Sequence, residues 1–447
     1  MATLLRDSTD TPGDRQLHLN TFGIGYGFHL ASWLHPSVDL AQSWDLGHHQ
    51  RVAALAERGL FDALFIQDGQ GLSVEDPTIG GNGETKPEPL TILSALAATT
   101  ERLGLASTFS TTYNEPYNIA RFVASLDLLS KGRAGWNIVT SQKALDAANF
   151  GDTELPSHAE RYRRSEEFVQ VVKGLWDTWD ADALVGDRVN RRLVDPSKVR
   201  RLNYEGEYFS VRGPLNVPRS PQGRPVLFQA GSSEIGREQG ARHGDVIFTA
   251  QTDLTGAQDF YTDLKRRAVT IGRDPSQILI VPGLLPVIGS TDHEAQELVQ
   301  FFNDNLDIDA GIAFWKAFTG LDLAGADLSK PIPDSLWDKS GRDFKSRVAV
   351  LRERANAESL TALEVLQKGT LGYGHFTTIG TPEKVADEIE LWFKAKGADG
   401  FNVLSLISPA SLEVFVDHVV PILQKKGIFR RDYTSETLRG HYGLAPL

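Results

Sequence analysis

The chain contains no cysteine among its 447 residues. This absence excludes disulfide bonds, thiolate catalysis, iron–sulfur clusters and zinc sites built on cysteine. Methionine is nearly absent as well, since Met1 is the only one. Basic residues are the minority, with 46 Lys+Arg against 58 Asp+Glu and a formal net charge of −12. Because binding to nucleic-acid phosphates requires a basic surface, this acidic balance argues against a nucleic-acid partner.

Long apolar runs are also missing. The longest apolar stretch, Ile278 to Gly289, is interrupted by prolines and a glycine and is shorter than the ~20 residues of a membrane-spanning helix. Residues 1–15 are polar and lack the apolar region of an export signal. We therefore expect a cytoplasmic protein with a flexible segment at residues 1–16. Residues 17–447 are expected to form one domain.

The clearest positive pattern is an alternation of short apolar runs with helical stretches, which predicts parallel strands covered by helices. Eight such units are typical of a (β/α)8 (TIM) barrel, so the predicted fold class is α/β. An open doubly wound sheet is the competitor, but the G-x-G-x-x-G fingerprint after its first strand is absent. The eight predicted strands are 17–24, 63–66, 103–109, 135–139, 226–230, 245–248, 278–288 and 400–404.

Two connections are longer than a plain barrel needs. Residues 140–225 follow the fourth strand, and residues 290–380 follow the seventh. The second connection reads as three helices, over 292–305, 310–318 and 345–367. Long insertions on this side of a barrel usually shape or cover the active site.

Functional side chains of a barrel are expected just after each strand. Asp68 follows the second strand, Thr108 lies at the end of the third, and Asn137 and Thr140 lie at the end of the fourth. These amide, hydroxyl and carboxylate groups suit a polar ligand with many hydrogen-bond acceptors. They do not form a hydrolytic dyad or a set of metal ligands.

A phosphate site is predicted after the fifth strand, where Gly231, Ser232 and Ser233 precede a helix. Glycine permits close approach, and free N–H groups at a helix N-terminus attract anions. His158 and Tyr162 lie four residues apart at another helix start, on one face, so both can reach one ligand. The alternatives are an ordinary capped helix and a solvated surface pair.

Other candidates carry weaker signals. The pair His48–His49 has no supporting pattern of metal ligands, so no metal site is expected, and Ser232 lacks the G-x-S-x-G context of a nucleophile. Trp136 and Trp33 are either core residues or walls of an aromatic pocket.

The sequence resembles the flavin-dependent monooxygenases of the bacterial-luciferase-like superfamily. Within it, the nearest subgroup contains nitrilotriacetate, dibenzothiophene-sulfone and long-chain alkane monooxygenases. The likeness extends from about Leu17 to Leu444. Its matching blocks are Arg58–Asp62, Phe65–Gly69, Glu88–Thr91, Ser107–Tyr117, Gly132–Ser141, His158–Tyr162, Arg212–Pro218, Gln229–Ser233, Ala398–Phe401, Phe429–Tyr433 and Thr437–Arg439.

The resemblance implies an enzyme that takes reduced FMN from a separate NAD(P)H:flavin reductase. It would use O2 to oxygenate a small organic substrate through a flavin hydroperoxide. Because the flavin carries the chemistry, no catalytic side chain is assigned. The flavin positions carried over by motif are Asp68, Thr108, His158, Tyr162, Ser232 and Ser233, with Asn137 and Thr140 along the isoalloxazine; Tyr162, Ser232 and Ser233 should hold the phosphate.

The expected substrate is a polar carbon–nitrogen or carbon–sulfur compound, similar to nitrilotriacetate or to a sulfone or thioether. The alternatives are a deazaflavin-dependent oxidoreductase and a non-enzymatic flavin-binding or ligand-binding protein. A homodimer or homotetramer is expected.

Overall fold

The computed structural model describes residues 15–23, 25–72, 85–152, 154–338 and 345–447. The flexible segment expected over residues 1–16 therefore lies outside the described residues, apart from its last two positions. Within the described ranges, no helix combines the length and apolar character needed to cross a membrane.

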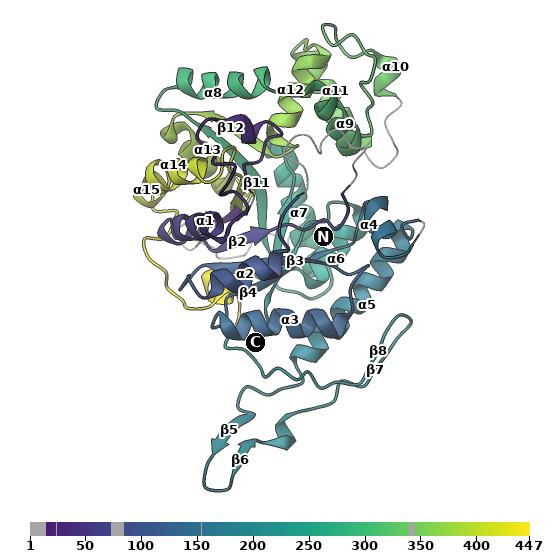
Figure 1. Ribbon diagram of the computed structural model, residues 1–447, viewed down its shortest axis with the longest axis vertical. Coiled ribbons are helices and arrows are strands. Elements are labelled where there is room, and N and C mark those ends of the chain that lie inside the picture. The colour runs from purple at the N-terminus through teal and green to yellow at the C-terminus, as the bar shows by residue number, and fades with distance from the viewer. Residues whose placement is uncertain (1–14, 24, 73–84, 153, 339–344) are drawn as a thin grey trace, which may run out of the picture.

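Eight parallel strands close into a barrel (Figure 1). Neighbouring strands pair in the order β10-β9-β4-β3-β2-β1-β13-β11, and β10 pairs with β11 to close the ring. The expected (β/α)8 barrel is confirmed. Its strands are β1 His18–Phe22, β2 Ala63–Ile66, β3 Gly104–Ser110, β4 Ala134–Val139, β9 Val226–Gln229, β10 Val246–Thr249, β11 Leu279–Ile288 and β13 Gly400–Val403.

Helices surround the barrel, most of them where the apolar period of the sequence predicts a helix; the helices after β13 were not predicted. Side-chain caps set several of their starts: Asp45 accepts the backbone N–H of His48, and Ser157 that of Glu160. The outer helices are α1 Leu46–Arg58, α2 Pro89–Ala97, α3 Pro116–Leu129, α5 His158–Trp176, α6 Glu234–His243, α7 Leu254–Thr270, α13 Pro382–Lys394, α14 Ala410–Val414, α15 Val420–Lys425 and α16 Leu438–His441.

Strand side chains alternate between the barrel interior and the helix layer. Phe65 packs inside, 5.3 Å from Phe22 and 5.9 Å from Phe228 between ring centroids. Trp136 lies in the helix layer, fully buried at 5.9 Å from Phe168 of α5. Trp136 is therefore a core residue, and its alternative as a wall of a ligand pocket is wrong.

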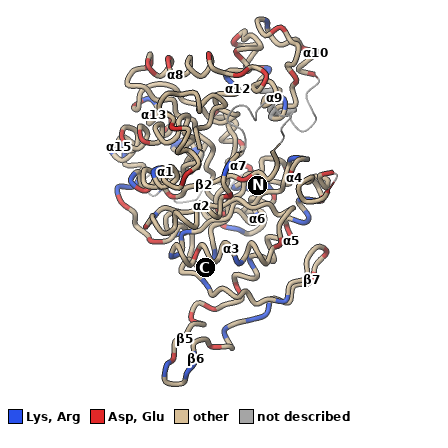
Figure 2. Tube along the Cα trace, viewed as in Figure 1, with Lys and Arg blue, Asp and Glu red and all other residues tan. Residues whose placement is uncertain are grey.

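The connection after β4 contains α4 Ala144–Asn149, α5 and two small hairpins. These hairpins pair β5 Leu184–Asp187 with β6 Arg192–Val194, and β7 Tyr204–Glu205 with β8 Ser210–Val211. Both hairpins project from the barrel body (Figure 1), and basic residues gather around the turn between β5 and β6 (Figure 2).

The connection after β11 is mainly helical: α8 Asp292–Asp304, α9 Ile308–Thr319, α10 Asp334–Trp337, α11 Lys345–Ala357 and α12 Ala362–Gly372. Two features differ from the prediction. The single helix expected over 345–367 is two helices, because Ser359 has a φ of 52° and Thr361 starts α12 with a capping box. The connection also ends in a strand, β12 Phe376–Gly380, which pairs in parallel with the second half of β11.

Candidate functional site

The first group of predicted residues lies at the ends of β2, β3 and β4. Asn137 Nδ2 donates to Thr108 Oγ1 at 3.0 Å, and Thr108 Oγ1 donates to the carbonyl of Ile66 at 2.7 Å. Asn137 Oδ1 is buried without a hydrogen-bond partner within the described part of the chain. The two side chains thus form a fixed polar surface with one acceptor still available.

Asp68 and Thr140 lie on the same edge of the barrel, after β2 and β4. Asp68 is half-buried, and this burial raises the pKa of its carboxyl above the usual value, while Lys86 lowers it. Thr140 is buried. The barrel therefore brings four of the predicted residues to the ends of three adjacent strands.

The second group lies where α5 and α6 begin. His158 and Tyr162 are one turn apart on α5, with ring centroids separated by 4.7 Å. Gln239 of α6 donates to the hydroxyl of Ser165 of α5 at 2.7 Å. This contact holds the two helices together, so that their first turns face the same space.

Gly231 lies against residues of both helices. A Cβ atom at this position would be closest to Nε2 of Gln229 and would lie 2.9 Å from Cα of Gly236 and 3.0 Å from the Tyr162 hydroxyl. Only glycine leaves room here. Ser233 caps α6, accepting the N–H of Gly236 at 3.2 Å, and both Ser232 and Ser233 are exposed. The structure therefore places the Tyr162 hydroxyl beside Gly231, the residue before Ser232 and Ser233. The role of these residues toward a phosphate stays a prediction.

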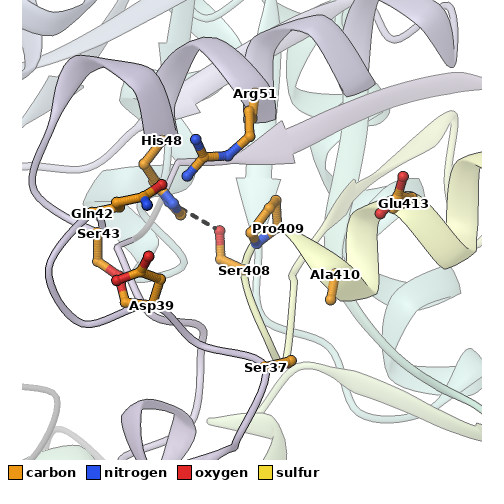
Figure 3. A pocket seen from close by; sticks show the side chains of 10 residues that line it. All are labelled: Ser37, Asp39, Gln42, Ser43, His48, Arg51, Ser408, Pro409, Ala410 and Glu413. Atoms are coloured by element: carbon orange, nitrogen blue, oxygen red, sulfur yellow. Dashed lines mark hydrogen bonds between the residues drawn. The ribbon is translucent and has the colours of Figure 1, made fainter.

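A polar cavity of about 450 Å³ lies beside this edge of the barrel, between α1 and α14 (Figure 3). His48 points toward Ser408 there, with Nε2 and Oγ 3.3 Å apart. Arg51, Asp39 and Glu413 give the cavity charges of both signs. None of the eight predicted flavin-binding residues lines this cavity, so it is distinct from the two groups above.

The barrel matches a known protein family over most of its length. The profile of the luciferase-like monooxygenase family matches residues 21–400. The chain belongs to this family. The family predicted from the sequence motifs is therefore confirmed.

Several known members of the luciferase-like family align over nearly their whole length. N-acetyl-S-(2-succino)cysteine monooxygenase of Bacillus subtilis (strain 168) is 44% identical over 97% of this chain and 98% of its own. Nitrilotriacetate monooxygenase component A of Aminobacter aminovorans is 38% identical over 97% of both chains. A crystal structure of riboflavin lyase with modified FMN and riboflavin has a TM-score of 0.85, with 33% identity over 97% of both chains.

The two groups of residues fit a flavin nucleotide. A phosphate needs donors, and the Gly231 loop offers backbone N–H groups at the start of α6, two hydroxyls and the Tyr162 phenol. A flavin ring needs polar groups along one edge, and Asn137 Oδ1 is a buried acceptor without a partner in the described residues. Where the chain is described, no cluster of His, Cys, Asp or Glu could hold a metal ion.

One buried arginine beside Tyr162 was not predicted as a site residue. Arg161 follows the first turn of α5, directly before Tyr162, and is 8% exposed. Its Nη1 donates to the carbonyl of Ser141, whose hydroxyl lies 2.7 Å from that of Ser110. In the sequence, the position of Arg161 inside the block His158–Tyr162 pointed to the site. Helix spacing alone, however, does not show which groups the arginine contacts.

Proposed function

We propose that this protein is the oxygenase of a two-component system, which uses reduced FMN and O2 to oxygenate a small organic substrate. The observation that carries this proposal is the close packing of Tyr162 and Gly236 around Gly231, which we call the glycine cradle. Tyr162 reaches Gly231 beside the capped start of α6, and Asn137 donates to Thr108 near the ends of the neighbouring strands, with Asp68 following β2 on the same edge of the barrel. The cradle supplies a phosphate site, and the neighbouring polar surface supplies a ring site.

The roles of the side chains follow from their chemistry. The serine hydroxyls, the Tyr162 phenol and His158 would hold the phosphate. Asp68, Thr108, Asn137 and Thr140 would hold the ring and the sugar-like chain. Reduced FMN, when bound, supplies the chemistry that activates O2, so the protein needs no strong acid or nucleophile of its own. Its tasks are to orient both reactants and to exclude water.

The partner in this proposal is a separate NAD(P)H:flavin reductase that supplies reduced FMN. The relative from Aminobacter aminovorans is named as component A of its system, which supports a division of labour between two proteins. We also propose the single barrel domain over residues 17–447 and a homodimer or homotetramer, as expected from the family. The connection at 290–380 would cover the site.

For the substrate, we propose a polar carbon–nitrogen or carbon–sulfur compound. The names of two relatives support this choice, since one acts on N-acetyl-S-(2-succino)cysteine, a thioether, and the other on nitrilotriacetate, a tertiary amine.

The test is reconstitution with a general flavin reductase, NADH and FMN under ¹⁸O2, with these two compounds as substrates. The proposal expects product that carries one ¹⁸O atom and O2 consumption that rises with product. The purified protein should be nearly colourless and should bind reduced FMN more tightly than oxidised FMN. Stoichiometric yellow FMN that survives dialysis, together with direct NADH oxidation by this chain alone, would contradict it. Turnover of a deazaflavin without O2 would favour the alternative oxidoreductase.

A further inference from the structure

Within the described residues, Arg161 is a buried cation without a matching anion. Nη1 of its guanidinium donates to the carbonyl of Ser141, and its Nε is buried without a hydrogen-bond partner in this part of the chain. Among the ion pairs of the described residues, none joins Arg161 to an Asp or Glu, and no carboxylate is among the groups that shift its pKa. Burial lowers the pKa of the Arg161 guanidinium, as expected for a cation that loses water without gaining a carboxylate.

Among the described residues, the other buried arginines either pair with a carboxylate or donate from all three guanidinium nitrogens, although Nε of Arg430 also has no partner there. Arg430 pairs with Asp62, and Arg439 pairs with Asp245 at 3.1 Å. Arg133 has no ion pair, but Nε, Nη1 and Nη2 all donate to carbonyl or hydroxyl oxygens. An unpaired buried charge is strongly unfavourable in a folded protein. We therefore expect a bound ligand to provide the anion for Arg161.

The position of Arg161 on α5 separates it from the glycine cradle. Arg161 and Tyr162 are consecutive on α5, so their side chains leave the helix about 100° apart. Tyr162 reaches Gly231, whereas Arg161 reaches Ser141, the residue after Thr140. In the proposed function, Thr140 lies along the flavin ring. The anion for Arg161 is thus expected on the ring side of the ligand.

We propose that Arg161 holds the negative charge of the reduced flavin ring and thereby makes the site prefer reduced over oxidised FMN. This inference rests on the proposed function. The reduced ring loses a proton near neutral pH and then carries a negative charge along N1 and the C2 carbonyl, whereas the oxidised ring is neutral. A hydrogen bond to a charged oxygen is about twice as strong as one to a neutral oxygen. An enzyme that receives reduced FMN from another protein and releases oxidised FMN needs a higher affinity for the reduced form than for the oxidised form.

The experiment compares Arg161→Gln, which removes the charge, with Arg161→Lys, which keeps it. Arg164→Gln is the matched control, because Arg164 lies on the same helix and donates to the carbonyl of Thr111 at 3.2 Å. Reduced and oxidised FMN are titrated anaerobically into each variant, and the ratio of the two affinities is measured. The spectrum of bound reduced FMN is followed with pH, since it reports the protonation of the ring.

The proposal expects Arg161→Gln to lower the affinity for reduced FMN about tenfold or more, which is the effect of losing one hydrogen bond to a charged group. The affinity for oxidised FMN should change much less. The pKa of bound reduced FMN should rise in this variant. Arg161→Lys should restore most of the preference, and Arg164→Gln should leave the ratio unchanged.

Three outcomes would overturn the proposal. An unchanged affinity ratio in Arg161→Gln would show that the ring charge is not its partner. An equal loss for both redox states of FMN, absent with riboflavin, would place the phosphate there instead. Unaltered FMN binding with a weaker affinity for nitrilotriacetate would assign Arg161 to a substrate carboxylate. Failure of the proposed function is distinct, because it would appear as absent ¹⁸O incorporation in the wild-type protein, whatever the affinity ratio.

Discussion

The glycine cradle makes a sharp prediction about Gly231→Ala. The new methyl group would lie closest to Nε2 of Gln229, a side-chain end that can turn away, and then 2.9 Å from Cα of Gly236 and 3.0 Å from the Tyr162 hydroxyl. Side-chain Cβ atoms rarely make contacts shorter than 3.4 Å, so all three contacts must lengthen. The contact with Gly236 is to the backbone, and no side-chain rotation can relieve it. Because Gly236 belongs to the first turn of α6, the start of this helix must move away from Gly231 and Tyr162.

Such a shift lengthens the hydrogen bonds that would hold the phosphate. One hydrogen bond to a charged group contributes about 1.5–3 kcal/mol, so we expect FMN to bind about ten to a hundred times more weakly. Riboflavin, which has no phosphate, should bind almost as in the wild type. The assay is anaerobic titration of both reduced ligands, followed by absorbance.

Gly311→Ala is the control, because it makes the same chemical change inside α9. The new Cβ would come no closer than 3.5 Å to its neighbour Leu306, an ordinary contact. Alanine favours a helix interior over glycine by about 1 kcal/mol, so this variant should be at least as stable as the wild type. If Gly231→Ala folds and binds FMN with unchanged affinity, or loses riboflavin as severely as FMN, the phosphate does not lie in the cradle.

Further predictions concern the phosphate donors, a buried acid and the long insertion. Ser233→Ala and Tyr162→Phe should each weaken FMN binding by about 1.5–3 kcal/mol and riboflavin binding far less. Asp68→Asn should weaken the binding of both ligands alike. Equal losses of FMN and riboflavin affinity in the first two variants would refute the phosphate assignment. Burial raises the pKa of Asp127 to about 7, so the folded protein holds a proton that the unfolded chain releases at about pH 4. The wild type should therefore lose stability relative to Asp127→Asn as the pH rises from 5 to 8, measured by urea unfolding, and a constant difference would count against this sign. Residues 290–380 should exchange amide hydrogens more slowly when FMN and a substrate are bound; an unchanged rate would argue against a cover.

Much of the barrel could be predicted because its elements leave local marks in the sequence. Most strand residues are buried, so strands such as β2 and β9 appear as short apolar runs, and the helices repeat their apolar residues with the helical period. Caps such as Asp45 and Ser157 mark helix starts for the same local reason. The strand β12 escaped prediction because its pairing depends on the free second half of β11, almost a hundred residues earlier in the chain.

The sequence by itself determined which residues stand at the ends of the strands, since parallel strands place their carboxyl ends on one edge. It thereby selected Thr108, Asn137 and the serine loop as candidates. Only the tertiary structure decided which of them meet: that Asn137 donates to Thr108, that Tyr162 reaches Gly231, and that Trp136 turns into the helix layer. It also decided that Arg161 is buried with no carboxylate paired to it among the described residues. The physical reason is that pairing and burial are properties of neighbours in space, which local periodicity does not encode.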